Sequence, residues 1–173
     1  MSQPVDDTFV QQLNQHLGIA HKVCGIYFTD AEEKQDVVQE TLYQLWRSYP
    51  GFDGRSKFST WMYSVCLNTA LTYRRKERKH KHLPLAQRHQ QIPEAPAGDQ
   101  EEDLQLLYDA IATLSPLNKA IVLLYLEDLR YEEIAQITGF TKSNVSVRLV
   151  RIKKELESIL KKQSNTYSDA NLR

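Results

Sequence analysis

The sequence lacks the long apolar run and the cysteine framework that define several protein classes. No hydrophobic run approaches the roughly 18 residues of a membrane span, and residues 1–12 have neither the basic start nor the apolar core of a secretory signal. We therefore expect a cytoplasmic protein without membrane insertion. Its two cysteines, Cys24 and Cys66, lie in apolar helical contexts without metal-ligand spacing, which predicts reduced, buried thiols.

Net charge is also missing, because 22 Lys and Arg residues balance 22 Asp and Glu residues. The charges are nevertheless segregated along the chain. Residues 74–82 hold six Lys or Arg against one Glu, and residues 139–162 hold seven against two acidic residues. Residues 30–40 hold five acidic residues against one Lys, and residues 89–103 hold five against no Lys or Arg. This distribution predicts two surfaces for anionic partners and at least one separate surface.

Helical periodicity begins in the N-terminal half, at residues 8–28. Asp30 is expected to cap a second helix, with Glu33 completing a capping box, and Pro50 to end it. The apolar residues expected inside this helix are Val38, Leu42, Leu45, Trp46 and Tyr49. The opposite face carries Asp36, Gln39, Glu40, Tyr43 and Arg47. A merely solvated face is the alternative to a binding face here.

A loop with Gly51 and Gly54 precedes a third helix, which is expected to begin at Ser59 or Thr60 and to reach about Lys81. The aromatic residues around this loop and helix are Phe58, Trp61, Tyr63 and Tyr73. Aromatic residues next to cations suit a single-stranded nucleic acid, because rings stack on unpaired bases at about 1–3 kcal/mol each and cations hold phosphates. The alternative is that the rings belong to the core and that the basic run is a helix end.

Periodicity stops at residues 83–103, where three prolines and an acidic end indicate a flexible linker between two domains. A new apolar stripe runs from Leu104 to Leu114, and Ser115 is expected to cap the next helix with Pro116 at its first position. After Leu160 the tail is expected to be disordered.

Residues 131–156 predict two helices joined by a tight turn, in which Gly139 suits a positive φ. One face of the second helix is apolar, with Val145, Leu149, Ile152 and Leu156. Amides, hydroxyls and cations occupy the remaining positions, which is typical of a DNA-reading helix-turn-helix. An ordinary helical hairpin with a solvated basic face is the alternative.

Three motifs in order resemble those of bacterial RNA polymerase sigma factors, and the compact form is similar to the extracytoplasmic-function subfamily. They are DVVQETLYQLW from Asp36, FDGRSKFSTWMYSVCLNTA from Phe52, and the segment that runs from Leu114 to Leu156. The resemblance covers about residues 8–162 and implies an all-α fold of two helical domains. It also implies a protein without catalytic activity or cofactor, which binds core RNA polymerase and promoter DNA and is held by an anti-sigma factor.

The resemblance further implies a region 2-like domain at residues 1–88, a linker at 89–103, a region 4-like helix-turn-helix domain at 104–163 and a disordered tail at 164–173. By position, the residues that bind core polymerase are Asp36, Gln39, Glu40, Tyr43 and Arg47. Those that capture the −10 element as single-stranded DNA, with one base flipped into a pocket, are Ser56, Lys57, Phe58, Trp61, Tyr63, Asn68, Arg74 and Arg75.

Recognition of the −35 element in duplex DNA falls by the same resemblance on the last predicted helix. The residues implied are Lys142, Ser143, Asn144, Ser146, Val147, Arg148, Arg151, Lys153 and Lys154, of which Arg148 and Lys154 are expected at phosphates. The chain departs from the family at Ser143-Asn144 and Ser146, and its GRSK loop is more basic than usual. Because Asn pairs bidentately with adenine, the DNA preference is expected to differ.

Two other classes remain open on the residues alone. A helix-turn-helix regulator with a helical sensor or dimerisation domain explains residues 115–160 but leaves the aromatic and basic stretch at 58–82 unexplained. A metal-dependent enzyme would need the three histidines of the basic segment, His80, His82 and His89, which have no acidic ligands nearby. No Gly-rich phosphate loop or nucleophile motif supports an enzyme, and no metal site is expected.

Overall fold

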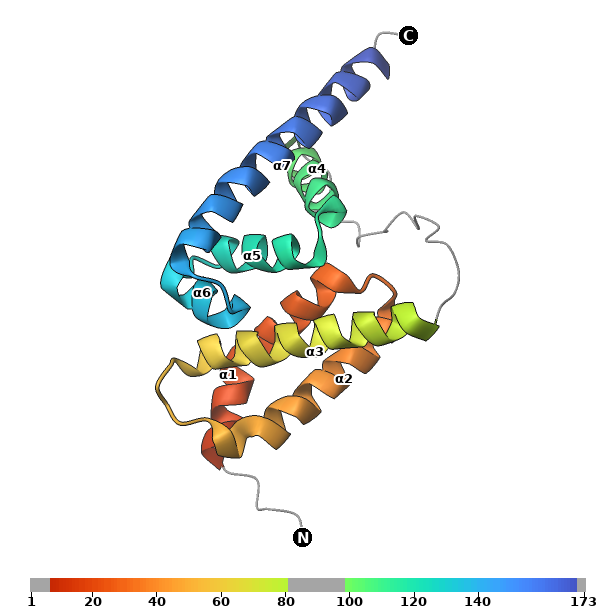
Figure 1. Cartoon of the computed structure of the whole chain (residues 1–173). Coiled ribbons are helices and arrows are strands. Elements are labelled where there is room, and N and C mark those ends of the chain that lie inside the picture. The colour runs from red at the N-terminus through yellow and green to blue at the C-terminus, as the bar shows by residue number, and fades with distance from the viewer. Residues whose placement is uncertain (1–6, 81–98, 171–173) are drawn as a thin grey trace. The chain divides into compact units, whose positions relative to one another are not determined.

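The computed structural model describes the backbone of residues 7–80 and 99–170 and the side chains of residues 7–78 and 104–162. The chain divides into two compact units, Met1–Gln91 and Ile92–Arg173 (Figure 1). Across the described ranges the regular structure is helical, without a strand. The predicted all-α fold with two helical domains is therefore confirmed. Most of the predicted linker at 89–103 lies outside the described residues.

The first unit contains α1 (Asp7–Tyr27), α2 (Ala31–Ser48), the short 3-10 helix η1 (Tyr49–Gly51) and α3 (Phe58–His80). Helix α3 packs against both α1 and α2, and it crosses them in Figure 1. Small residues are fully buried in the two helices that pack most extensively, with Ala20 and Cys24 in α1 and Cys66 and Ala70 in α3. Small side chains shorten the distance at which two helices can pack.

Both cysteines are free and buried in this core, as predicted. Burial raises the pKa of the Cys24 thiol and the pKa of the Cys66 thiol, because the thiolate loses its hydration there. The two groups also lie within electrostatic range of each other. Neither thiol therefore has the lowered pKa and the access to solvent that mark a reactive cysteine.

Helix α2 begins where the sequence predicted, since Asp30 Oδ1 accepts a hydrogen bond from Glu33 N–H at 2.9 Å. Its buried stripe is rotated relative to the prediction. Val37, Thr41 and Leu45 are fully buried, whereas Trp46, which was expected inside, is 41% exposed. The reason is that the Thr41 hydroxyl donates a hydrogen bond to the Val37 carbonyl at 2.7 Å, so a polar residue occupies the core without an unsatisfied group.

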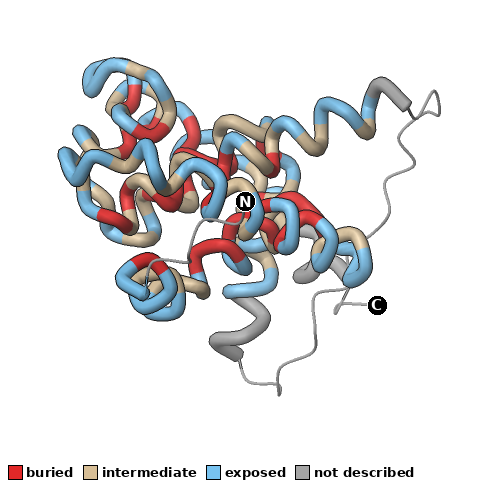
Figure 2. Tube along the Cα trace, turned by 90° about the horizontal axis from the view of Figure 1, so that it is seen from below, coloured by how far each residue is buried: buried red, intermediate tan, exposed pale blue. Residues whose placement is uncertain are grey.

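The second unit contains α4 (Asp99–Thr113), α5 (Pro116–Leu126), α6 (Tyr131–Thr138) and α7 (Lys142–Ala170). Helices α4, α5 and α6 all pack against α7. The largest fully buried side chains of this unit are Ile121, Leu124, Ile134, Val145, Leu149 and Ile152. Figure 2 shows buried and exposed residues side by side along the tube, as expected for helices with one apolar side. The predicted apolar face of α7 is confirmed at its first three positions, and Leu156 is half-buried.

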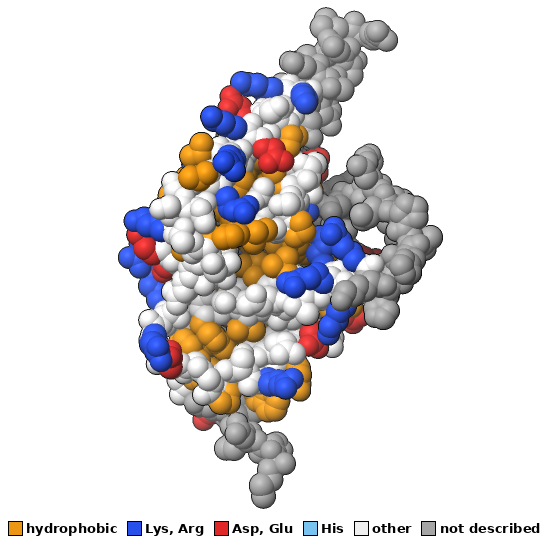
Figure 3. Space-filling view, in the orientation of Figure 1, with side chains coloured by type: hydrophobic (Ala, Val, Ile, Leu, Met, Phe, Trp, Pro, Cys, Tyr) orange, Lys and Arg blue, Asp and Glu red, His pale blue; other side chains and the backbone are white. Residues whose placement is uncertain are grey.

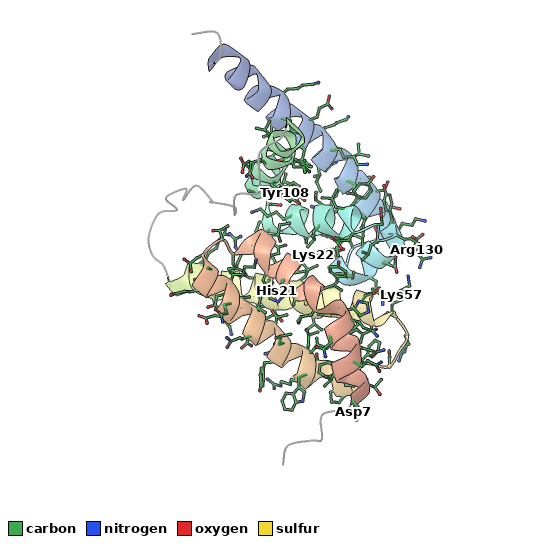
Figure 4. The ribbon with its side chains drawn as sticks, turned by 180° about the vertical axis from the view of Figure 1, so that it is seen from behind. Asp7, His21, Lys22, Lys57, Tyr108 and Arg130 are labelled. Atoms are coloured by element: carbon green, nitrogen blue, oxygen red, sulfur yellow. The ribbon has the colours of Figure 1, made fainter. Side chains whose placement is uncertain are left out.

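The ends of α5 and α6 follow from local signals in the sequence. Ser115 Oγ accepts a hydrogen bond from Asn118 N–H at 3.3 Å, and Pro116 is the first residue of α5. Gly139 has a φ of 76°, and its N–H donates to the Ala135 carbonyl at 2.9 Å, which ends α6 as predicted. Arg130, labelled in Figure 4, precedes α6, and its backbone N–H donates to Glu133 Oε2 at 3.0 Å.

Two helices extend beyond their predicted ends. Helix α7 continues to Ala170, whereas residues 164–173 were expected to be a disordered tail. No Gly or Pro interrupts residues 142–170, so nothing in the sequence ends the helix earlier. Helix α4 begins at Asp99, inside the predicted linker and directly after Gly98. Residues 171–173 of the predicted tail lie outside the described residues.

None of the helices in the described ranges is long and apolar enough to cross a membrane.

The turn at Gly139 gives a first test of this architecture. Gly139→Ala is expected to lower the free energy of unfolding of the second unit by about 1–2 kcal/mol, because an L-residue is strained at positive φ. Both tryptophans, Trp46 and Trp61, belong to the first unit, so far-UV circular dichroism should detect the change and tryptophan fluorescence should not.

Gly18→Ala is the matched control, because a Cβ at this position of α1 meets no atom within 4 Å. Alanine is the better helix former there, so the variant should raise the free energy of unfolding of the first unit by up to about 1 kcal/mol. Tryptophan fluorescence measures this change. Equal destabilisation by both alanines would contradict the description of the Gly139 turn.

Candidate functional site

The outer face of α2 brings together all the residues that were predicted to bind core polymerase. Asp36, Gln39, Glu40, Tyr43 and Arg47 are exposed. The Tyr43 ring lies 6.0 Å from the ring of Trp46, centroid to centroid. Tyr43 and Trp46 are thus two large aromatic side chains exposed to solvent on a largely acidic helix face. This combination is typical of a protein interface.

Trp46 is thus a candidate binding residue that the sequence prediction placed in the core. The signal that could have revealed it is the run Val37, Thr41 and Leu45, which has helical spacing and competes with Trp46 for the buried side. Thr41 carries a hydroxyl group, so apolar periodicity alone does not include it in the buried run.

An aromatic cluster surrounds the start of α3, where base stacking was predicted. The Phe58 ring lies 6.4 Å from Phe9, 5.8 Å from Phe52 and 5.3 Å from Trp61, centroid to centroid. Phe58 is only 7% exposed, and Tyr63 is only 4% exposed. For these two residues the core interpretation therefore holds, and neither ring face is open to a base in this conformation.

Trp61 differs from its neighbours because it is half-buried. Its ring packs on Phe52 at 5.1 Å, which fixes its position while part of its surface stays in solvent. Of the aromatic side chains predicted to contact the −10 element, Trp61 is the one that the structure leaves available for stacking.

The loop before α3 is held by its own residues. Asp53 accepts a hydrogen bond from Arg55 N–H at 3.1 Å and pairs with the Arg55 guanidinium at 2.6 Å, and Gly54 adopts a φ of 71°. Ser56 is half-buried and Lys57 is exposed, and both directly precede α3. Lys57 is labelled in Figure 4. The loop therefore places two predicted −10 residues beside the aromatic cluster.

A polar groove of about 460 Å³ lies between α2 and α3. Its lining residues are Glu40, Gln44, Asn68, Thr69, Thr72, Tyr73 and Lys76. The groove brings Glu40, predicted to bind polymerase, together with Asn68, predicted to bind DNA. Thr72 and Lys76 were missed, although they follow Asn68 at four-residue intervals and therefore share its side of the helix.

Arg74, which was predicted to contact DNA, makes a contact within the first unit. Its Nη1 donates to the carbonyl of Tyr27, the last residue of α1, at 3.4 Å, and its guanidinium lies 5.9 Å from the centre of the Tyr27 ring. A cation at the end of a helix also interacts favourably with the helix dipole. Arg74 therefore fastens α3 to α1, whereas Arg75 is exposed.

The N-terminal half of α7 exposes most of the residues predicted to read duplex DNA. Thr141 Oγ1 accepts a hydrogen bond from Asn144 N–H at 3.2 Å, which caps the helix just before Lys142. The exposed members of the predicted set are Lys142, Ser143, Asn144, Val147, Arg151, Lys153 and Lys154, and the half-buried members are Ser146 and Arg148. All of them lie outside the buried stripe of α7.

Three cations of this set are engaged within the unit. Lys142 pairs with Glu132 of α6 at 2.5 Å, and hydrogen bonding to Lys142 lowers the pKa of the Glu132 carboxyl. The Arg148 guanidinium lies 4.5 Å from the centre of the Phe140 ring. Lys153 Nζ donates to Tyr125 OH at 3.0 Å, which raises the pKa of Lys153.

Arg151 and Lys154 are exposed on α7 and make no comparable hydrogen bond or ring contact within the described part of the chain. They can therefore contact a ligand without first breaking a side-chain hydrogen bond or a ring contact.

Residues with metal-ligating side chains do not gather in the described part of the chain, where no group of three His, Cys, Asp or Glu could hold a metal ion. The side chains of His80, His82 and His89 lie outside the described residues.

Residues 12–80 match the sequence family described as Sigma-70 region 2, and residues 104–156 match the one described as Sigma-70, region 4. The chain is 30% identical over 154 residues to the ECF RNA polymerase sigma-E factor of Haemophilus influenzae, which covers 80% of this chain and 81% of that protein. It is 27% identical over 154 residues to the RNA polymerase sigma factor SigV of Bacillus subtilis, with 87% and 90% covered.

The fold is similar to that of the sigma factor RpoE in its complex with the anti-sigma factor NepR from Bartonella quintana, with a TM-score of 0.75 at 22% identity. That similarity covers 90% of this chain and 98% of the other. A second similar structure is CnrH in complex with the cytosolic domain of CnrY, with a TM-score of 0.64 at 19% identity, covering 88% and 87% of the two chains.

The contacts of Arg74 predict a stability effect. Arg74→Ala should lower the free energy of unfolding of the first unit by about 1–2 kcal/mol, because it removes a charged hydrogen bond and a cation–π contact. Arg75→Ala, which removes an exposed cation next to it, should change stability by less than about 0.5 kcal/mol. Urea unfolding followed by tryptophan fluorescence measures both. Equal effects would show that the contact of Arg74 with Tyr27 does not stabilise the first unit.

Proposed function

The chain belongs to the extracytoplasmic-function subfamily of the sigma-70 RNA polymerase sigma factors, and we propose how its residues divide the tasks of promoter recognition. The observation that carries the proposal is the order of two sigma regions on two separate units, region 2 at 12–80 and region 4 at 104–156. A regulator that acts without core polymerase is not favoured, because region 2 would then have no role.

Core polymerase binds the exposed face of α2 in this proposal. Asp36, Gln39 and Glu40 supply carboxylates and an amide for a basic partner surface, and the aromatic pair of Tyr43 and Trp46 supplies the apolar contact area. An acidic face with exposed aromatic rings suits a protein partner and repels phosphates. This supports a polymerase contact and argues against a contact of DNA phosphates with the same residues.

Single-stranded −10 DNA binds along the loop before α3 and the groove between α2 and α3. Ser56, Lys57, Trp61, Asn68 and Arg75 contact the strand, and a flipped base occupies part of the polar groove. Holding unstacked bases offsets the cost of opening the duplex. Phe58, Tyr63 and Arg74 act indirectly here, since they hold Trp61 and α3 in place.

Duplex −35 DNA binds the N-terminal half of α7, which enters the major groove in the manner of a recognition helix. Ser143, Asn144, Ser146, Val147 and Arg151 face the base edges. The phosphate contacts come from Lys142, Arg148, Lys153 and Lys154. Lys142, Arg148 and Lys153 are already oriented by Glu132, Phe140 and Tyr125, so these side chains lose less freedom when DNA binds.

Two further parts of the proposal concern context. The similar solved structures contain sigma factors bound to anti-sigma factors, NepR in one case and CnrY in the other, and we extend this mode of inhibition to the present chain. The protein carries no catalytic activity of its own, needs no cofactor, and works in the cytoplasm, where core polymerase and promoter DNA are found.

The α2 face provides the test of polymerase binding. Trp46→Ala should weaken the affinity for core polymerase by roughly tenfold or more, because buried aromatic side chains dominate protein interfaces. Gln39→Ala/Glu40→Ala should do the same. Val10→Ala removes an exposed apolar side chain from α1 and should leave the affinity within about twofold. Fluorescence anisotropy with purified core polymerase measures all three. Undiminished binding of both α2 variants would refute this surface.

One substitution in each unit should separate the two DNA contacts. In the holoenzyme, Arg151→Ala should weaken binding to a duplex −35 element by about 1–3 kcal/mol without affecting promoter opening once bound. Trp61→Ala should leave duplex binding intact and reduce opening, which permanganate reactivity of unpaired thymines detects. Core polymerase binding is the control for both variants. If Trp61→Ala and Arg151→Ala impaired the same step, the assignment of one DNA element to each unit would be wrong.

A further inference from the structure

Two valines interrupt the polar surface of α7 on the side opposite its buried stripe. Val147 is 49% exposed and Val150 is 53% exposed, and they are the large exposed hydrophobic residues of this helix among the described side chains. Residues three apart are neighbours on a helix surface, so the two side chains form one apolar patch. Figure 3 shows hydrophobic side chains among Lys and Arg along α7.

Polar residues border this apolar patch along the same side of the helix. Ser143 lies one turn before Val147, and Arg151 and Lys154 lie one turn after Val147 and Val150. Both cations are exposed, and neither is held by a hydrogen bond or a ring contact within the described residues. Val147 and Val150 share this side of α7 with Arg151 and Lys154. If the two cations contact DNA, the two valines therefore face the base pairs in the groove.

The chemistry of valine restricts what it can recognise there. Its side chain has no hydrogen-bond donor or acceptor, so it leaves the polar edges of guanine, adenine and cytosine without a partner. The major-groove edge of thymine alone carries a methyl group, at C5. An isopropyl group against this methyl removes apolar surface from water on both partners, which is favourable.

We infer that Val147 and Val150 select thymine at two positions of the −35 element. The inference rests on the proposed function, in which α7 reads the major groove, and it adds the identity of two bases. The two Cβ atoms of such a pair are about 5–6 Å apart, whereas successive base pairs are about 3.4 Å apart along the duplex. The two thymines therefore lie in neighbouring base pairs or one base pair apart.

The test uses the holoenzyme formed from the full chain and core polymerase. Duplexes with a randomised −35 region are selected for binding, and each thymine of the enriched site is then replaced by deoxyuridine, which deletes only the methyl group. For the wild type, deoxyuridine at the two positions should weaken binding roughly fourfold each, equivalent to about 0.8 kcal/mol per methyl. Val150→Ala should remove the sensitivity at one position, and Val147→Ala at the other.

Leu104→Ala is the matched control, because Leu104 is an apolar side chain of α4 with 52% exposure and lies outside α7. This variant should keep both deoxyuridine effects. Enriched sites without thymine, or equal deoxyuridine effects in wild type and valine variants, would overturn the inference. So would loss of core polymerase binding in the valine variants with unchanged deoxyuridine effects, since the valines would then contact protein. An absence of any enriched sequence would instead mark failure of the proposed function itself.

Discussion

The packing of α3 against both α1 and α2 is the constraint on which the first unit depends. Met62, Cys66 and Ala70 are fully buried by it, so α3 has only a narrow side left for partners. Asn68, with Thr72 and Lys76 at the next two turns, occupies that side and lines the groove that α2 completes with Glu40. In the proposed function, the surface for a nucleic acid therefore lies directly beside the surface for a protein, because both are the uncovered sides of helices that share one core.

In the second unit, packing against neighbouring helices likewise decides which side of one long helix, α7, stays exposed. Val145, Leu149 and Ile152 fix the rotation of α7 by their burial, and the Thr141 cap and the Gly139 turn fix where it begins. Its cations then fall into two groups. Lys142, Arg148 and Lys153 are oriented by residues of the same unit, whereas Arg151 and Lys154 extend into solvent. A helix with three oriented cations and two solvent-exposed cations suits the proposed role in the major groove, where some contacts fix position and others read base sequence.

Features governed by neighbouring residues were predictable from the sequence. The caps at Asp30 and Ser115 and the positive φ of Gly139 depend on contacts three or four residues away, and all occur as predicted. Tertiary packing decided the rest. Trp46 is exposed because Thr41 takes the core position, and Phe58 and Tyr63 are buried although rings beside cations suggested stacking. Arg74 donates a hydrogen bond to the carbonyl of Tyr27, 47 positions earlier in the chain. A local sequence pattern cannot predict such a contact.

We propose that this chain gives core RNA polymerase its choice of promoter through two promoter elements, each read by one unit. The most direct measurement is the mapping of transcript 5′ ends made by purified core polymerase on genomic DNA with and without the chain. With the chain present, we expect a limited set of new start sites that share two sequence blocks at a constant spacing upstream. Start sites no more specific than those of core polymerase alone, or sites that share only one block, would contradict it.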